Sequence, residues 1–201
     1  MSLELVLGPM FAGKSSYILS SLRRYEAIGW NILCITSDLD TRYEEGAIHS
    51  HNHDRHSAIP TATLMPLLKT NQYKDARLLI IEEAQFFPDL YSFVEMAVDQ
   101  HGKDVIVVGL DGDSERRPFG KILSLIPLCD KVTKLTAMCK RCEMPTDAIF
   151  TYRKNGDKSV VSVGADAEYE ALCRTHYTRL VGISNESKQT SLASSADGGD
   201  S

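Results

Sequence analysis

The chain has 201 residues, of which 43% are hydrophobic, and a formal net charge of −5. This length and composition suit one domain with a substantial core, with or without a small appendage. The acidic balance and the lack of a Lys/Arg cluster argue against a protein that mainly grips nucleic acid. The lack of a leader segment and of an apolar run of about 18 residues predicts a cytoplasmic protein with no membrane partner.

The first expected element is a phosphate-binding loop. An apolar run at residues 3–7 leads into Gly8-Pro9-Met10-Phe11-Ala12-Gly13-Lys14-Ser15, which matches G-x-x-x-x-G-K-[ST] at every fixed position. Apolar residues then recur at helical spacing and predict a helix that ends near Gly29. In such a unit the backbone N–H groups cradle the phosphates of a nucleoside triphosphate, Lys14 reaches the β- and γ-phosphates, and Ser15 binds Mg²⁺. A chance match in a glycine turn would leave the flanking strand and helix unexplained.

The next stretch predicts a second strand and then a polar loop. Residues 31–36 are rich in β-forming residues, so the chain up to this point is a βαβ unit of a parallel sheet. Residues 37–57 are polar and contain four histidines, which are His49, His51, His53 and His56. A metal site is one interpretation, but their alternating spacing without a neighbouring cysteine fits no common ligand set. We favour a mobile polar loop that closes over a substrate.

A pair of glutamates follows the next buried strand. A short strand at 61–65, a helix from Pro66 and a connector at 71–75 are expected before it. The apolar run at 77–81 predicts the strand, and Glu82 and Glu83 come directly after it, at the edge where parallel sheets bind ligands. Downstream of a phosphate loop, one of the two carboxylates is expected to orient Mg²⁺ or its waters and the other to accept a proton from a substrate hydroxyl. The alternative, two solvated glutamates at a helix start, does not explain the buried strand before them.

Further alternation of helices and strands completes an α/β fold. The expected elements are a helix from Pro88 to about residue 100, a strand at 103–110 and a last strand at 131–137. A stretch with basic and aromatic residues, 116–120, lies between these two strands. The alternation predicts a P-loop NTPase domain of the RecA-like kind over residues 1–137, with a parallel sheet and helices on both of its faces.

Two pairs of metal-ligating residues stand about 30 residues apart after this domain. They are Cys139 and Cys142 in a C-x₂-C spacing, and Cys173 and His176 in a C-x₂-H spacing. With candidate strands between them at 147–153 and 158–163, they predict a closed, structural Zn²⁺ site of a zinc-ribbon-like kind. A redox-active C-x-x-C or unrelated thiols are the alternatives.

The remaining cysteines and the end of the chain carry no predicted chemistry. Five cysteines, an odd number, suit a reducing compartment better than a disulfide framework. Cys34 and Cys129 lie in apolar surroundings and are expected to be buried structural thiols. We expect a zinc-binding domain at 138–183 and a disordered tail, rich in Ser, Gly, Ala and Asp, at 184–201.

Together these stretches resemble the type II thymidine kinases, a tetrameric zinc-containing family. The matching stretches, in family order, are the phosphate loop, Asp40-Thr41-Arg42-Tyr43, His53-Asp54, Glu83-Ala84-Gln85-Phe86-Phe87, Leu110-Asp111-Gly112, Arg117-Pro118-Phe119-Gly120, the two zinc pairs, and Gly164 with Tyr169. They cover residues 3 to about 178, and the combination of the loop, E-x-Q-F-F and a zinc pair is highly specific.

The resemblance implies a salvage kinase that transfers the γ-phosphate of ATP to the 5′-hydroxyl of thymidine, with deoxyuridine as a second substrate. It implies that Glu83 is the general base and that Arg42 lies near the phosphates. The nucleoside-binding residues that it implies are the pocket walls Met10, Phe86, Leu110 and Phe119, and the residues of a zinc-anchored lasso loop, Thr151, Val160, Gly164 and Tyr169. A homotetramer inhibited by the end product thymidine triphosphate (dTTP) is expected on the same ground.

Three departures from the family pattern keep other functions open. The chain has Glu82 where Asp is usual, Ser114 where animal members have an aromatic residue, and Ala165 where a lasso glycine is common. Ser114 motivates a kinase shifted to another deoxynucleoside. A nucleic-acid-dependent NTPase with a zinc ribbon is a second alternative, against which the net charge counts. A non-catalytic nucleotide-binding homologue is a third, against which the intact Lys14 and Glu83 count.

Overall fold

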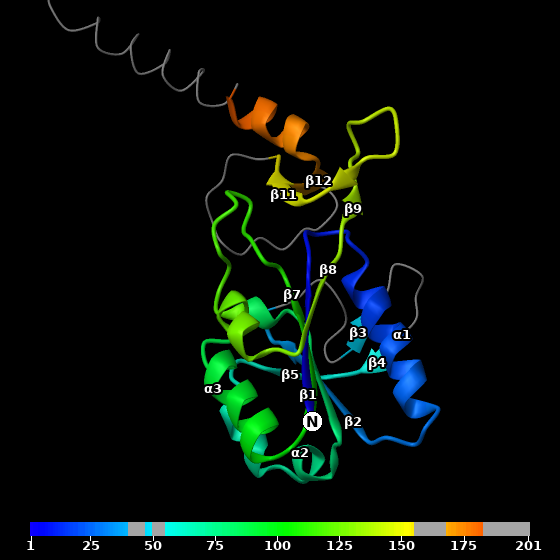
Figure 1. The fold of residues 1–201 in the computed structure, drawn as a ribbon, viewed down its shortest axis with the longest axis vertical. Coiled ribbons are helices and arrows are strands. Elements are labelled where there is room, and N and C mark those ends of the chain that lie inside the picture. Colours follow the sequence, from blue (N-terminus) through cyan, green and yellow to red (C-terminus); the bar gives the residue numbers. More distant parts are fainter. Residues whose placement is uncertain (40–46, 50–54, 155–167, 183–201) are drawn as a thin grey trace, which may run out of the picture.

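The structure is a computed structural model that describes residues 1–39, 47–49, 55–154 and 168–182 (Figure 1). Its elements are β1 (Ser2–Leu7), α1 (Lys14–Glu26), β2 (Ile32–Ser37), β3 (Ala47–His49), β4 (Arg55–Ser57), β5 (Ile59–Thr61), η1 (Met65–Lys69), α2 (Asn71–Asp75), β6 (Leu78–Ile81), η2 (Ala84–Phe86), α3 (Leu90–Glu95), η3 (Met96–Gln100), β7 (Asp104–Gly109), η4 (Ile122–Leu128), β8 (Lys131–Lys134), β9 (Ala137–Met138), β10 (Asp147–Ala148), β11 (Phe150–Arg153) and β12 (Tyr169–Leu172). Residues 174–182 are helical. The predictions for Arg42, His51, His53, Val160, Gly164, Ala165, the strand at 158–163 and the tail at 184–201 lie outside the described residues.

A six-stranded sheet with the order β5-β2-β6-β7-β1-β8 forms the centre of the molecule. Every neighbouring pair in it is parallel, as predicted. β1 and β2 are not adjacent, because β6 and β7 lie between them. β2 therefore lies on one side of β1 in the sheet and β8 lies on the other. Open parallel sheets bind ligands at the carboxyl ends of their strands where the strand order reverses in this way.

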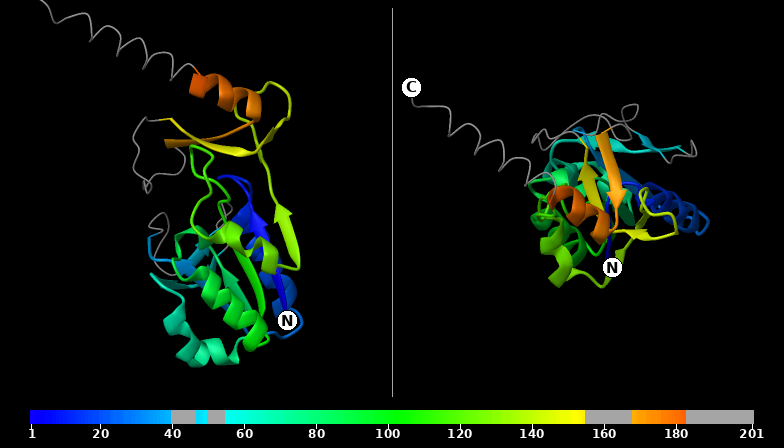
Figure 2. Two further views of the ribbon diagram at one scale, coloured as in Figure 1. Left: turned by 60° about the vertical axis from the view of Figure 1, so that its left-hand side comes forward. Right: turned by 90° about the horizontal axis from the view of Figure 1, so that it is seen from above.

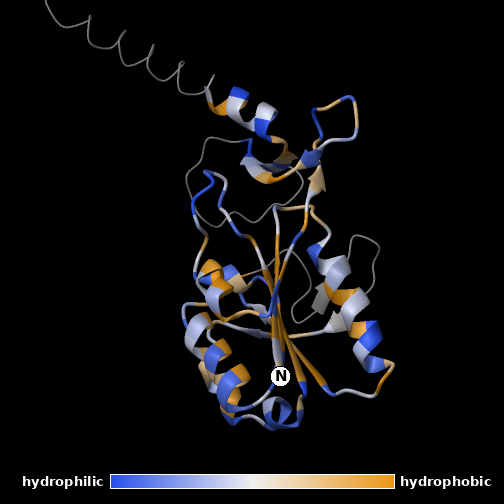
Figure 3. Ribbon diagram, in the orientation of Figure 1, coloured by the Kyte–Doolittle hydropathy of each residue, from blue (hydrophilic) through white to orange (hydrophobic). Residues whose placement is uncertain are grey.

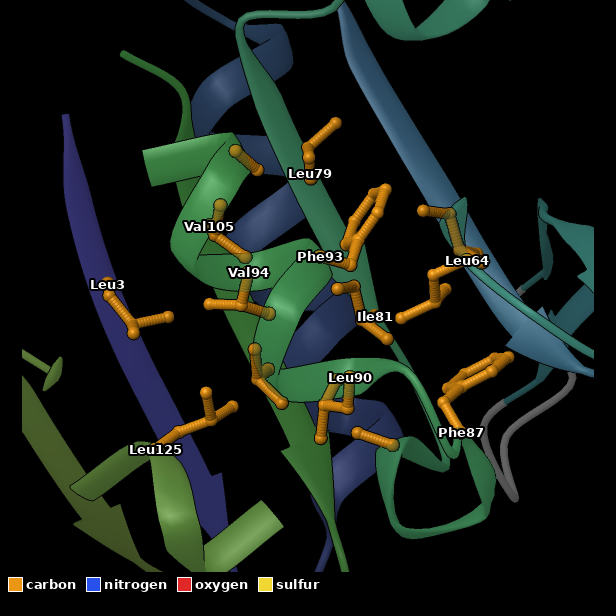
Figure 4. Close-up of a cluster of buried hydrophobic side chains, with 14 of the residues drawn as sticks. Leu3, Leu64, Leu79, Ile81, Phe87, Leu90, Phe93, Val94, Val105 and Leu125 are labelled. Atoms are coloured by element: carbon orange, nitrogen blue, oxygen red, sulfur yellow. The ribbon is translucent and has the colours of Figure 1, made fainter. Parts of the chain in front are cut away.

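The side chains of the central strands alternate between two buried clusters. Leu79 and Ile81 of β6 and Val105 of β7 pack with Phe93 of α3 on one face, which Figure 4 shows in close-up. The intervening residue Ile80 faces the opposite cluster, which contains α1 residues such as Leu22. Because successive side chains of a strand point to opposite faces, strands buried on both sides read as unbroken apolar runs. Figure 3 shows these strands as the hydrophobic centre, and Figure 2 shows the helices on either side.

A truncation at the centre of this core should lower the stability of the whole chain. Leu79 is fully buried in the cluster that contains Phe93, so Leu79→Ala should reduce the free energy of unfolding by about 3 kcal/mol through lost burial and a residual cavity. Leu39→Ala is the matched control, because Leu39 is 51% exposed, and it should change stability by less than about 0.5 kcal/mol. Urea denaturation of both variants measures the difference. Equal effects would contradict the position of β6 at the centre of the sheet.

Some elements differ from the sequence-based prediction for local reasons. Residues Asn71–Asp75, expected as a connector, form the short helix α2, because the Thr70 side chain caps it by accepting a hydrogen bond from the Tyr73 N–H (3.2 Å). The strand expected at 61–65 is β5, which lies earlier, at Ile59–Thr61. Part of the polar stretch forms an antiparallel pair of strands, β3 and β4, where a loop was expected. Cys34 is buried as predicted, whereas Cys129 is only partly buried.

A smaller group of elements, within residues 137–154 and 168–182, lies beyond the carboxyl edge of the sheet, at the top of Figure 1. We call this group the zinc unit. β9 pairs with β10 and β11 pairs with β12, both antiparallel, and the helical residues 174–182 follow. The sequence did not predict β12. The group has its own buried cluster, consisting of Ala137, Cys139, Ala148, Ala171, Leu172, Cys173 and Tyr177, which we call the zinc-unit cluster. Among the described residues, no helix is long and apolar enough to span a membrane.

Candidate active site

The predicted phosphate loop joins β1 to α1 at the carboxyl edge of the sheet. Gly13 precedes the helix in the left-handed conformation (φ 78°), which glycine adopts without steric cost. The Lys14 ammonium lies against the loop, where it donates to the carbonyls of Pro9 (2.8 Å) and Gly8 (3.3 Å). In the described part of the chain, no side chain caps the N-terminus of α1. The loop and the first turn of α1 therefore direct backbone N–H groups and a cation at one spot, as anionic phosphates require.

The predicted acidic pair lies beside this loop. The Ser15 hydroxyl donates to Oε1 of Glu82 at 2.8 Å, across 67 residues of sequence. A hydroxyl and a carboxylate in contact are the hard oxygen ligands that Mg²⁺ prefers. Glu83 follows directly and is buried, with 8% of its surface exposed. The edge of the sheet thus brings two carboxylates of different exposure next to the phosphate loop.

Backbone strain is concentrated around this edge. Among the described non-glycine residues, Phe11, Glu83 and Arg116 have positive φ, at 65°, 50° and 66°. The left-handed conformation costs a residue with a side chain about 1–3 kcal/mol, and it persists where the surrounding structure enforces it. One of the three residues lies in the phosphate loop, one is the predicted base, and one lies in the loop after β7. Such clustering is typical of a functional site.

Two of the predicted walls of the nucleoside pocket pack on each other, and a third is connected to Glu83 through Gln85. The rings of Phe86 and Phe119 form an edge-to-face pair with centroids 5.4 Å apart, and both are half-buried. Leu110 is also half-buried, and its backbone N–H donates to Oε1 of Gln85 at 3.0 Å. The other end of that amide, Nε2, donates to Oε2 of Glu83. Sequence analysis counted Gln85 as a fixed position of the E-x-Q-F-F motif but assigned it no role.

The zinc unit contacts the phosphate loop directly. The Met10 N–H donates to the hydroxyl of Thr151 in β11 at 3.0 Å, and Thr151 is 4% exposed. Phe11 and Ala12 pack against the zinc-unit cluster. Two predicted substrate-binding residues, Met10 and Thr151, are therefore hydrogen-bonded to each other across 141 residues of sequence. Tyr169, a third, begins β12, where its ring lies 5.5 Å from the guanidinium of Arg153.

A second contact joins the zinc unit to the loop after β7. The Tyr177 hydroxyl donates to the backbone carbonyl of Ser114 at 2.7 Å. Burial raises the pKa of Tyr177 above its ordinary value, so the phenol stays protonated and remains a donor. The Arg116 guanidinium stacks on the same ring, 4.7 Å from its centroid. Sequence analysis missed Tyr177, because nothing local indicates a partner so far away in the chain.

The four predicted zinc ligands converge at one point. Nδ1 of His176 lies 3.6 Å from the sulfur of Cys139, 3.4 Å from that of Cys142 and 3.3 Å from that of Cys173. The sulfurs of Cys142 and Cys173 are 3.8 Å apart. A tetrahedral Zn²⁺ with ordinary bond lengths separates its sulfur and nitrogen ligands by about 3.5–3.8 Å, so these residues fit the ion. Four protein ligands leave no open position, which is typical of a structural site.

The ionisation of two cysteines distinguishes the cluster from the core. For Cys139, burial favours the neutral thiol, but hydrogen bonds from the backbone N–H groups of Cys173 and Arg141 outweigh it and lower the pKa to about 6. A thiolate is the form that binds metal. Burial instead raises the pKa of Cys34 to about 12, which keeps it an inert thiol in β2.

The parallel sheet, the phosphate loop and the acidic residues after β6 define a P-loop nucleotide-binding protein with an attached Cys₃His cluster that fits Zn²⁺. The family model for thymidine kinase matches residues 1–177. The chain therefore belongs to the thymidine kinase family.

Curated relatives agree with this assignment. Thymidine kinase a of Arabidopsis thaliana is 38% identical over 179 residues, covering 88% of this chain and 74% of the relative. The cytosolic thymidine kinase of Homo sapiens is 37% identical (87% and 72%), and the thymidine kinase of Myxoma virus (strain Uriarra) is 36% identical (87% and 95%). The solved structure of a DNA replication initiation factor aligns with 67% of this chain and with 40% of the factor's own chain, at 12% sequence identity. Its TM-score of 0.41 adds nothing to the family assignment.

Proposed function

We propose that this protein phosphorylates thymidine at its 5′-hydroxyl with the γ-phosphate of ATP. The observation that carries the proposal is the buried carboxylate of Glu83, which lies next to a second acid, Glu82, in contact with Ser15 of the phosphate loop. Membership of the thymidine kinase family supports the choice of nucleoside. The 5′-oxygen forms a bond to the γ-phosphorus, the bond to ADP breaks, and Glu83 accepts the hydroxyl proton.

The remaining roles rest on the chemistry of the phosphate loop and on the family resemblance. Lys14 binds the β- and γ-phosphates, and Arg42, outside the described residues, is assigned the same partner. Ser15 and Glu82 would hold Mg²⁺, which neutralises phosphate charge when bound. The proposed pocket walls are Met10, Phe86, Leu110 and Phe119, and the proposed lasso residues are Thr151, Val160, Gly164 and Tyr169. Because transfer depends mainly on positioning and on exclusion of water, a closing lasso would suppress ATP hydrolysis.

Organisation and regulation are part of the same proposal. We assign residues 1–137 to the kinase domain and 138–183 to a zinc-binding lasso domain held by Cys139, Cys142, Cys173 and His176. The separate buried cluster of the zinc unit supports this division. A homotetramer, inhibition by dTTP and a cytoplasmic location rest on the family resemblance, and the human relative is named cytosolic.

A nucleoside panel tests the proposed function. The full chain is incubated with Mg·ATP and, in turn, thymidine, deoxyuridine, deoxycytidine or no nucleoside, and ADP and nucleoside monophosphate are quantified. We expect equimolar ADP and thymidine monophosphate, with deoxyuridine at most about 100-fold poorer, because one missing methyl group discriminates by roughly 1–3 kcal/mol.

Two outcomes of the panel would contradict the proposal. A preference for deoxycytidine would indicate a shifted nucleoside pocket, for which Ser114 would be the first residue to examine. ATP consumption without nucleoside phosphorylation would also contradict it, and stimulation of that consumption by added DNA or RNA would then indicate a nucleic-acid-dependent NTPase.

A further inference from the structure

Gln85 occupies an unusual place for a neutral polar side chain. It is 4% exposed, it lies in the short helix η2 two residues after Glu83, and both ends of its amide are engaged. Nε2 donates to Oε2 of Glu83, and Oε1 accepts the backbone N–H of Leu110. A carboxylate only accepts and a backbone N–H only donates, so these two partners fix the orientation of the amide.

Two glycines lie against Gln85, one at its amide and one at its main chain. A Cβ atom at Gly109, the last residue of β7, would meet Oε1 of Gln85, and a Cβ atom at Gly120 would overlap the Gln85 main-chain carbonyl. Gly120 also has a positive φ of 61°. The chain therefore leaves no room for a side chain at either position. Close contact at Gly109 holds the amide, and close contact at Gly120 holds the main chain of Gln85.

The two partners of the amide belong to different parts of the site. Glu83 follows β6 and has a left-handed backbone (φ 50°, ψ 40°), which its own conformational preferences do not favour. Leu110 follows β7, the next strand of the sheet. The strands pair only as far as Ile81 and Val107, so beyond this point the Gln85 amide connects the two segments.

We propose that Gln85 is a positioning residue, whose amide fixes the Glu83 carboxylate relative to the nucleoside-pocket wall at Leu110. This inference rests on the proposed function, in which Glu83 accepts the proton of the 5′-hydroxyl. A base must lie within hydrogen-bond reach of the proton that it removes, and a misplacement of about 1 Å can lower a rate about 100-fold. Because one rigid amide connects base and pocket wall, the nucleoside and its proton acceptor keep one relative geometry.

Two substitutions separate this role from simple packing. Gln85→Met keeps the length of the side chain but removes both hydrogen bonds. We expect kcat to fall about 10–100-fold, while the KM for ATP stays within about twofold, since Lys14 and Ser15 are untouched. Gln100→Met, at an exposed glutamine of η3, is the matched control and should leave both constants unchanged.

Gln85→Glu gives a distinct signature in the dependence of rate on pH. The new carboxyl still accepts from Leu110, but it can donate to Glu83 only while the pair retains a proton. Adjacent carboxylates share one proton and repel each other once it is lost. The kcat of this variant should therefore fall as the pH rises from about 6 to 9, whereas that of the wild type should not.

Glu83→Gln, assayed in parallel, distinguishes failure of this inference from failure of the proposed function. Wild-type turnover by Glu83→Gln would refute Glu83 as the base and the positioning role with it. An inactive Glu83→Gln together with wild-type kinetics for Gln85→Met would overturn only the role of Gln85. If Gln85→Met does not fold, the Gln85→Glu profile decides, and a profile parallel to the wild type overturns the inference.

Discussion

Glu83→Gln should lower the kcat for thymidine phosphorylation by about 1,000-fold, within the range of a lost general base. The amide has nearly the shape of the carboxylate but cannot accept the 5′-hydroxyl proton. Its oxygen can still accept from Nε2 of Gln85, which in the wild type donates to Oε2 of Glu83, so the buried site should keep its structure. Steady-state kinetics measure the loss, and calorimetric titration should show a thymidine Kd within about threefold of the wild-type value, because the variant removes an interaction of the transition state.

Glu82→Gln provides the comparison for this prediction. Glu82 accepts the Ser15 hydroxyl at 2.8 Å, so its loss should raise the Mg²⁺ concentration needed for half-maximal rate instead of abolishing transfer at saturating metal. A Glu83→Gln variant with at least a third of the wild-type kcat would refute the assignment of the base. An exchange of the two phenotypes would mean that the two carboxylates have the opposite roles.

The local parts of this site could be predicted because they depend on short segments. The phosphate loop is eight consecutive residues, and β6 is recognisable as a strand buried on both faces that ends at the acidic pair. The zinc ligands follow from spacing, since two pairs of ligands at short intervals have few other uses in a reducing compartment. The order of the strands was not predictable in this way, and β6 and β7 separate β1 from β2.

The contacts between distant segments could not be predicted, because their partners are chosen by the fold. Gln85 and Leu110 are 25 residues apart, and Tyr177 and Ser114 are 63 residues apart. A glutamine or a tyrosine has no pattern that names its partner at such a distance. The left-handed backbone of Glu83 could not be predicted either, because a glutamate does not favour this conformation and the surrounding structure enforces it.

The composition of the zinc-unit cluster leads to the second large prediction. Two of its seven buried residues, Cys139 and Cys173, belong to the predicted metal site, and three others are alanines. Among the described residues of the cluster, Leu172 and Tyr177 are the large apolar side chains that are fully buried, and those that pack against it, such as Phe150, are only partly buried. Hydrophobic burial therefore stabilises this unit weakly. Structural Zn²⁺ sites stabilise small domains by about 10–16 kcal/mol in zinc-finger peptides. We expect the unit to unfold when the metal is removed.

Loss of the metal should therefore impair the phosphate loop as well as the zinc unit. Thr151 accepts the Met10 N–H and the zinc-unit cluster packs on Phe11, so an unfolded unit withdraws support from the loop that binds ATP. The Cys173→Ser protein should contain less than about a tenth of a zinc per chain and should lose its protease resistance near residue 150. It should bind ATP at least about 10-fold more weakly, with its turnover lowered further. Elemental analysis, limited proteolysis and ATP titration measure these three changes.

Cys129→Ser is the control, since Cys129 lies outside the cluster and its sulfur only donates to the Ile126 carbonyl at 3.2 Å. A Cys173→Ser protein with full zinc content would contradict the ligand assignment, and one without zinc but with wild-type ATP affinity would contradict the dependence of the loop on the zinc unit.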